Sequence, residues 1–123
     1  MPTIPESLQY TAEHEWVDSA EPATIGITAV AADALGDIVY VDLPDVGVAV
    51  VAGQVFGEVE SVKSVSELFS PVTGTVVEVN AAVVDSPELL NADPYGDGWL
   101  IRVDVDSAGP VLTAAEYGEL TGA

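Results

Sequence analysis

The 123-residue chain contains no cysteine and a single histidine, His14. Neither a disulfide nor a zinc–thiolate site can therefore stabilise the fold, and one histidine argues against a histidine-based metal cluster. Basic residues are almost as scarce, because Lys63 and Arg102 stand against 21 acidic residues and leave a formal net charge of −19. Nucleic acids and anionic membranes bind clustered Lys and Arg, so the sequence predicts neither as a partner and favours basic surfaces of other proteins.

Long apolar runs and targeting signals are also lacking. No stretch approaches the ~20 apolar residues that span a bilayer. The opening MPTIPESLQY has neither the basic nor the apolar region of a secretory signal, and we therefore expect a cytoplasmic, bacterial protein. With 49% hydrophobic and 19% charged residues the composition is that of a globular chain, and the length predicts one domain over residues 1–123.

The chain is rich in short valine-containing runs separated by Gly, Pro and Asp, which predicts a mainly β fold. An Ala-rich segment at 29–35 that stops at Gly36 predicts a short helix, and the capping-box spacing of Thr113 and Glu116 predicts a second over 113–120. Strands are expected over 15–19, 23–28, 37–43, 54–61, 65–70, 75–80 and 99–105. Alternation predicts inward-facing side chains at Val55, Val59, Val77 and Val79, and at Trp99, Ile101, Val103 and Val105.

An internal repeat appears when the sequence is compared with itself at a separation of 38 residues. Two such β units packed face to face predict a small β-sandwich with quasi-twofold symmetry. A chance likeness between valine-rich strands is the alternative. The shift aligns Gly36, Ile38, Val39, Val41 and Val46 with Gly74, Val76, Val77, Val79 and Val84.

Lys63 is the one lysine of the chain and lies between the two copies of the repeat, where one expected strand gives way to the next. We expect a β-hairpin turn at 61–64 with the amine in solvent. Nothing nearby predicts desolvation, so the pattern does not indicate a Schiff-base lysine. An exposed amine on a rigid turn suits the substrate of a modifying enzyme, although position alone also fits an ordinary surface lysine.

Five ordered blocks carry a resemblance to a known family. GEVESVKSVSELFSPVTGTVVEVN, at 57–80, strongly resembles the lipoyl-lysine hairpin of the glycine cleavage H-protein family. The resemblance covers about residues 10–120 and implies a barrel-sandwich hybrid with the lysine on a hairpin turn. The other blocks are YTAEHEWV (10–17), ATIGITAVAADALGDIVYVDLPDVG (23–47), DPYGDGWLIRV (93–103) and EYGEL (116–120).

The resemblance implies a non-catalytic carrier with lipoate joined covalently to Lys63 as an N6-lipoyl group. Its arm would take the aminomethyl group of glycine from a pyridoxal-phosphate-dependent decarboxylase (P protein) and pass it to a folate-dependent aminomethyltransferase (T protein). A dihydrolipoamide dehydrogenase (L protein) and a lipoate-attaching enzyme are the further implied partners. Glu15 and Glu67 match family positions that can face the arm, and are candidates for sheltering its protonated amine. Two ordinary solvated glutamates are the alternative.

Other interpretations stay open at this stage. One is a lipoyl relay or a carrier for another pathway, and another is an unmodified acidic β module that only binds a partner. Biotin-carrier domains place methionines on both sides of the modified lysine, whereas Val62 and Ser64 flank Lys63 here. The sequence shows no phosphate-binding loop, no metal-ligand spacing and no histidine beside the serines of the hairpin, so we expect neither an enzyme nor a metal site.

Overall fold

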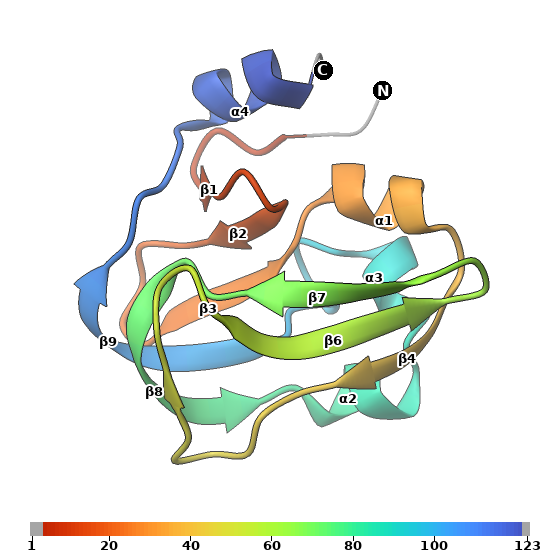
Figure 1. Cartoon of the computed structure of the whole chain (residues 1–123), viewed down its shortest axis with the longest axis horizontal. Coiled ribbons are helices and arrows are strands. Elements are labelled where there is room, and N and C mark those ends of the chain that lie inside the picture. Colours follow the sequence, from red (N-terminus) through yellow and green to blue (C-terminus); the bar gives the residue numbers. More distant parts are fainter. Residues whose placement is uncertain (1–3, 122–123) are drawn as a thin grey trace.

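In the computed structural model, which describes residues 4–121, two antiparallel sheets pack against each other with short helices around them (Figure 1). The larger sheet has the strand order β1-β2-β3-β9-β8-β5 and the smaller one β4-β6-β7. This arrangement agrees with the expected mainly β sandwich. The strands are β1 (Gln9–Tyr10), β2 (Glu15–Val17), β3 (Ala23–Ile27), β4 (Ile38–Asp42), β5 (Ala49–Val50), β6 (Val55–Ser61), β7 (Val65–Phe69), β8 (Val72–Val79) and β9 (Ile101–Ala108). The helices are α1 (Ala29–Leu35), α2 (Ala81–Asp85), α3 (Leu89–Ala92) and α4 (Ala114–Thr121).

Both expected helices form, and their caps explain where they begin and end. Helix α1 begins after Thr28, whose Oγ1 accepts a hydrogen bond from the N–H of Ala31 at 3.2 Å. It ends at Gly36, which adopts a positive φ of 78°. Helix α4 begins with a reciprocal capping box, in which the N–H groups of Thr113 and Glu116 donate to each other's side-chain oxygens at 3.0 and 3.2 Å.

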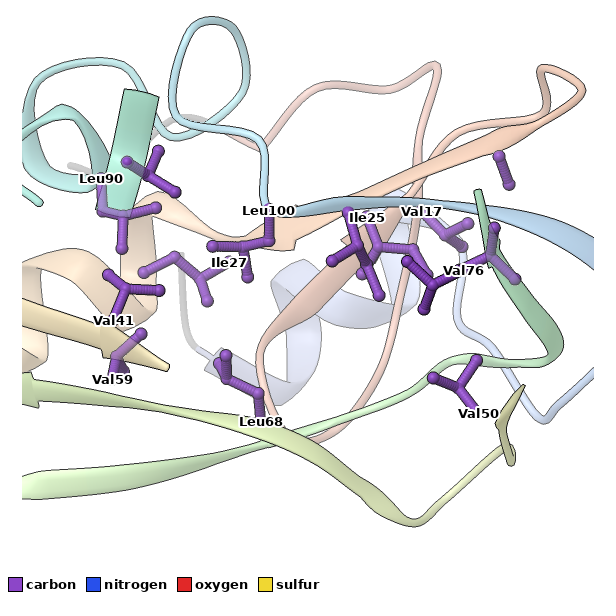
Figure 2. Close-up of a cluster of buried hydrophobic side chains, with 14 of the residues drawn as sticks. Val17, Ile25, Ile27, Val41, Val50, Val59, Leu68, Val76, Leu90 and Leu100 are labelled. Atoms are coloured by element: carbon purple, nitrogen blue, oxygen red, sulfur yellow. The ribbon is translucent and has the colours of Figure 1, made fainter. Parts of the chain in front are cut away.

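The main hydrophobic core lies between the two sheets. Figure 2 shows Val59 and Leu68 of the smaller sheet pointing toward Ile25 and Ile27 of the larger one, and all four are nearly fully buried. Burial of each such aliphatic side chain contributes about 1.5–3 kcal/mol to folding. The hairpin β6–β7 is therefore fixed to the body of the protein by its inner face, and its far end extends beyond the core (Figure 1).

Two of the valines expected to face inward do not. Val55 is 46% exposed and Val77 is 42% exposed. Each lies at an irregularity of strand pairing, between Val55 and Gly57 in β6 and between Val76 and Glu78 in β8. A bulge adds one residue to a strand and reverses the alternation of faces beyond it, so a strict two-residue period fails at these points.

The strict alternation expected over 99–105 is also only partly right. Ile101 and Val103 are buried as expected, but Leu100 is fully buried while Trp99 is only half-buried. Val105 is 37% exposed, because the pairing of β9 with β8 becomes irregular toward that end of the strand.

The two copies of the sequence repeat lie in different sheets, β4 in the smaller and β8 in the larger. Three of the five aligned pairs have similar environments, as expected for a quasi-twofold sandwich, whereas Val41 is buried and Val79 only half-buried. Ile38 and Val76 are buried, whereas Val39 and Val77, and likewise Val46 and Val84, are exposed.

A second, aromatic cluster joins elements from the two ends of the chain. Tyr10, Trp16 and Tyr117 form its buried part, and the rings of Tyr10 and Tyr117 stack at 4.7 Å. The hydroxyl of Tyr117 lies 2.6 Å from Nδ1 of His14 and 2.8 Å from Oγ1 of Thr28. Helix α4 is thereby fixed beside β1. It is eight residues long, and no helix within residues 4–121 is long and apolar enough to cross a bilayer.

Candidate functional site: the Lys63 hairpin

Lys63 lies in the exposed turn between β6 and β7, as the sequence predicts. Ser61, which is 5% exposed, holds the turn together. Its N–H donates to the carbonyl oxygen of Ser64 at 2.8 Å, and its Oγ accepts from the N–H groups of Lys63 and Ser64 at 3.2 and 3.1 Å. These bonds fix the backbone on both sides of the lysine, so the amine projects from a defined turn.

The turn also contacts the connection between α1 and β4, which passes beside the hairpin tip in Figure 1. The N–H of Val62 donates to the carbonyl oxygen of Asp37 at 3.0 Å. The stem of Lys63 lies over Gly36, because a methyl group built on Gly36 would be 3.4 Å from the lysine Cε and 3.9 Å from Nζ. The lysine therefore leaves the turn along a backbone surface that carries no side chain.

Sequence analysis missed the residue that holds this connection in place. Asn91, in α3, donates from Nδ2 to the carbonyl oxygen of Gly36 at 2.8 Å and accepts at Oδ1 from the N–H of Ile38 at 2.9 Å. The signal that could have drawn attention to it is an isolated amide directly after two leucines, in ELLNAD. Its partners lie more than fifty residues earlier in the chain, and nothing local predicts that pairing.

The two side-chain cations have different environments. Arg102 pairs with Glu78 at 2.8 Å, lies 4.1 Å from the ring centre of Trp99, and so has a structural role in the larger sheet. Lys63 takes part in no ion pair with any residue of the 4–121 segment. Its amine is thus exposed and without a competing partner, as a modification site requires.

Glu15 is not a solvated glutamate. It is 1% exposed, and its carboxyl group accepts hydrogen bonds from Oγ1 of Thr11 at 2.6 Å and from the N–H of Phe69 at 3.3 Å. Burial raises the pKa of Glu15 to about 7, because an ionised carboxylate is poorly solvated there, and the two hydrogen bonds only partly oppose this effect. Glu15 can therefore gain or lose a proton near neutral pH.

Glu67 is exposed on β7, directly opposite Glu58 of β6. Two carboxylates that face each other across a strand pair repel, which favours a nearby cation. Glu15 and Glu67 do not form one cluster with Lys63: in the part of the chain that the structure describes, neither carboxyl group is bonded to the lysine amine.

A pocket of about 220 Å³ adjoins Glu15. Thr11 and Phe69, which bind the Glu15 carboxyl group, both line it, whereas Glu15 itself does not. The exposed Glu13 does line the pocket, and sequence analysis did not select it, although it stands two positions before Glu15 in the same EHE triplet. The pocket is thus lined by the carboxylate of Glu13, and the buried carboxyl group of Glu15 lies directly behind the lining residues Thr11 and Phe69. No group of His, Asp and Glu side chains within residues 4–121 could hold a metal ion.

Comparison with known proteins agrees with the geometry of the hairpin. The family model described as "Glycine cleavage H-protein" matches residues 8–121. The chain belongs to this family. It is 57% identical over 120 residues to the glycine cleavage system H protein of Beutenbergia cavernae, with 97% of each chain covered. It is also 57% identical over 121 residues to that of Thermobifida fusca, covering 97% of this chain and 96% of the relative.

A solved structure extends the likeness to three dimensions. The crystal structure of a glycine cleavage system H protein from Mycobacterium marinum superposes with a TM-score of 0.94 at 49% identity, over 98% of this chain and all of that one. The family resemblance inferred from the five sequence blocks is thereby confirmed, and so is the mainly β barrel-sandwich fold.

Proposed function

We infer that this H-protein family member is the lipoyl-carrying shuttle of a glycine cleavage system, with lipoate attached to Lys63. The observation that supports this most directly is the position of the chain's one lysine, at the exposed tip of a hydrogen-bonded hairpin turn in a member of this family. Attachment joins the lipoate carboxyl group to Nζ as an amide and removes the positive charge. The exposed, unpaired amine fits this chemistry.

The chain's own residues would orient and shelter the arm. When bound, lipoate supplies a disulfide that can accept the aminomethyl group of glycine. Ser61 and the connection at Gly36 fix the root of the arm. Glu15, with Glu67 as a second candidate, would stabilise the protonated amine carried at the end of the arm. A cation near Glu15 favours its ionised form, so docking of the amine would release a proton near neutral pH.

The partners we propose are the decarboxylase (P protein), the aminomethyltransferase (T protein), the dihydrolipoamide dehydrogenase (L protein) and a lipoate-attaching enzyme. The net charge of −19 favours docking on basic surfaces and accelerates the encounter at low ionic strength. A tethered arm then presents its reactive end at high effective concentration to each docked enzyme. The chain would act as a substrate-carrying subunit and would not catalyse the reactions itself.

The attachment is tested by mass spectrometry. The purified chain is incubated with lipoate, ATP and a lipoate-attaching enzyme, and the intact mass is followed by peptide mapping of residues 54–80. We expect one lipoyl increment on Lys63 and none in the Lys63→Arg variant, which keeps the charge but lacks the reactive amine. Because no other lysine exists in the chain, the increment is assigned without ambiguity.

Other results would favour the alternatives. A biotinyl increment from cells supplied with both cofactors would move the chain to a different carrier class. An unmodified chain, together with a Lys63→Arg variant that keeps full function, would favour an acidic module that only binds a partner. A lipoylated chain that accepts no aminomethyl group from glycine and a decarboxylase would indicate a lipoyl carrier for another pathway.

The sheltering role of Glu15 is tested by the lifetime of the aminomethylated arm. Glu15→Gln keeps the shape of the side chain and removes its charge, so we expect the lifetime of the bound aminomethyl group to shorten about two- to fivefold, as for loss of a modest ion pair. Glu67→Gln and Glu13→Gln report on the two exposed carboxylates in the same assay. An unchanged lifetime in Glu15→Gln would rule out its role.

A further inference from the structure

The direction in which an arm leaves its attachment point depends on what lies beneath its root. The root of the Lys63 side chain lies over Gly36, and the neighbouring Val62 donates its N–H to the carbonyl oxygen of Asp37 at 3.0 Å. The connection at 36–38 is therefore the surface on which the hairpin tip rests. If this connection moved, the tip would lose the hydrogen bond from Val62 to Asp37 and the adjacent pairing of Ser61 with Ile38, where β4 meets β6.

This connection is itself held from the other side by α3. Asn91 makes two hydrogen bonds to it, donating to the carbonyl oxygen of Gly36 at 2.8 Å and accepting from the N–H of Ile38 at 2.9 Å. Gly36 offers a carbonyl acceptor and Ile38 an N–H donor, so the NH₂ group and the oxygen of the one Asn91 side chain satisfy both. A carboxylate or an aliphatic side chain of the same size could not make both bonds.

Gly36 contributes by having no side chain. Its φ of 78° with ψ of −154° is a conformation that residues with a Cβ adopt only with strain. A Cβ at this position would also stand at van der Waals distance from the lysine Cε. The glycine thus allows the connection to turn sharply after α1, directly beneath the lysine stem.

We propose that Asn91 is a positioning residue for the Lys63 arm: by clamping the turn at 36–38 it fixes the surface over which the lysine leaves the hairpin, and Gly36 allows that turn. Among the described residues the Asn91 side chain is bonded to Gly36 and Ile38 and not to the lysine amine, so it acts through Gly36 and through the contact between Asp37 and Val62. This rests on the proposed lipoyl attachment for its functional consequence, but the positioning of the hairpin tip does not depend on modification.

The physical part is tested on the unmodified chain by NMR. We expect an NOE between the Lys63 Hε protons and the Gly36 Hα protons, and a slowly exchanging Val62 amide. Asn91→Ala should weaken the NOE and lower the exchange protection of the Val62 amide at least tenfold, and Asn91→Asp, which keeps only the acceptor, should do the same. Glu88→Ala is the matched control, because Glu88 is exposed at the start of the same helix and its side chain caps nothing.

The functional part uses the lipoylated full-length proteins as substrates of a glycine decarboxylase. A loosened root leaves the docking surface intact but makes insertion of the arm less frequent, so we expect Asn91→Ala to lower kcat three- to tenfold with KM within twofold of the parent. Glu88→Ala should match the parent in both constants. A variant that was only less stable would keep the parent's kcat and KM once the folded fraction is equalised.

The outcomes separate the two proposals. If the parent chain is not lipoylated or accepts no aminomethyl group, the proposed function is wrong, whatever the NMR shows. If the parent is active and Asn91→Ala matches Glu88→Ala in kcat and in Val62 exchange, the positioning role is wrong and the proposed function stands. A rise in KM at constant kcat would also overturn the positioning role, because it would place Asn91 in the docking surface.

Discussion

Two effects act in opposite directions on the pKa of Glu15. The side chain is almost completely buried, yet both carboxyl oxygens accept hydrogen bonds, from Thr11 and from Phe69. Hydrogen bonds favour the ionised form and burial favours the neutral form, and burial has the larger effect. Because the folded state raises the pKa from 4.5 to about 7, Glu15 binds a proton more tightly in the folded chain than in the unfolded one.

This property predicts a specific dependence of stability on pH. Between about pH 4.5 and 7 the folded chain holds a proton on Glu15 that the unfolded chain has lost, so the contribution of Glu15 is fully present below this window and is lost as pH rises through it. Glu15→Gln removes the titration. From pH 5 to pH 8 we expect the free energy of unfolding of the variant to rise relative to the parent by on the order of 2 kcal/mol.

The measurement is urea unfolding at several pH values, with Glu88→Gln as the control. Glu88 is exposed and is not among the groups that shift the pKa of Glu15, so its variant should follow the parent curve. A Glu15→Gln curve that also ran parallel to the parent between pH 5 and pH 8 would show that Glu15 titrates as an ordinary glutamate.

At the scale of elements, helices with a clear composition or capping signal were predictable and elements held by distant contacts were not. Helix α1 could be recognised from its Ala-rich segment and the glycine that ends it, and α4 from its capping box. Helix α2 was missed because it is only five residues long; Asn80 caps it locally and is also bonded to the carbonyl groups of Asp97 and Trp99. The two-residue β5 likewise depends on β8, much later in the chain, and the two-residue β1 pairs with the neighbouring β2 and, through Tyr10, with Leu112.

Helix α4 depends on one side chain for its attachment. Tyr117 is fully buried, stacks on Tyr10, and places its hydroxyl against His14 and Thr28. Tyr117→Phe keeps the stacking and removes both hydrogen bonds, so we expect a loss of about 1–2 kcal/mol in the free energy of unfolding. Tyr117→Ala also removes the ring, and a loss of about 3–5 kcal/mol is expected.

Chemical denaturation followed by circular dichroism measures both variants. Tyr40→Phe is the matched control, because Tyr40 is 56% exposed and its change should stay within about 0.5 kcal/mol. If Tyr117→Phe were as stable as Tyr40→Phe, the hydroxyl network would contribute nothing to the attachment of α4.

For the whole molecule, the sequence predicted the class of fold and the exposed hairpin turn that carries Lys63, but not the environment of the two candidate carboxylates. Lys63 could be found because it is chemically isolated in an acidic chain and lies where one strand gives way to the next. The burial of Glu15 could not, because it depends on the N–H of Phe69, 54 residues away. The faces predicted for Val55 and Val77 were wrong for a local reason. Bulges break the alternation of the strand and leave no clear mark in the sequence.

The lone, exposed lysine on a hydrogen-bonded turn has a practical consequence for experiments in solution. Apart from the terminal amine, it is the one primary amine of the chain, so an amine-reactive fluorophore would label the molecule at the tip of its hairpin. Because Ser61 fixes the backbone there, the slow part of the dye's anisotropy decay would report the tumbling of the whole molecule, beyond the fast motion of the lysine stem. Association with a partner enzyme could then be followed optically, without introducing a cysteine.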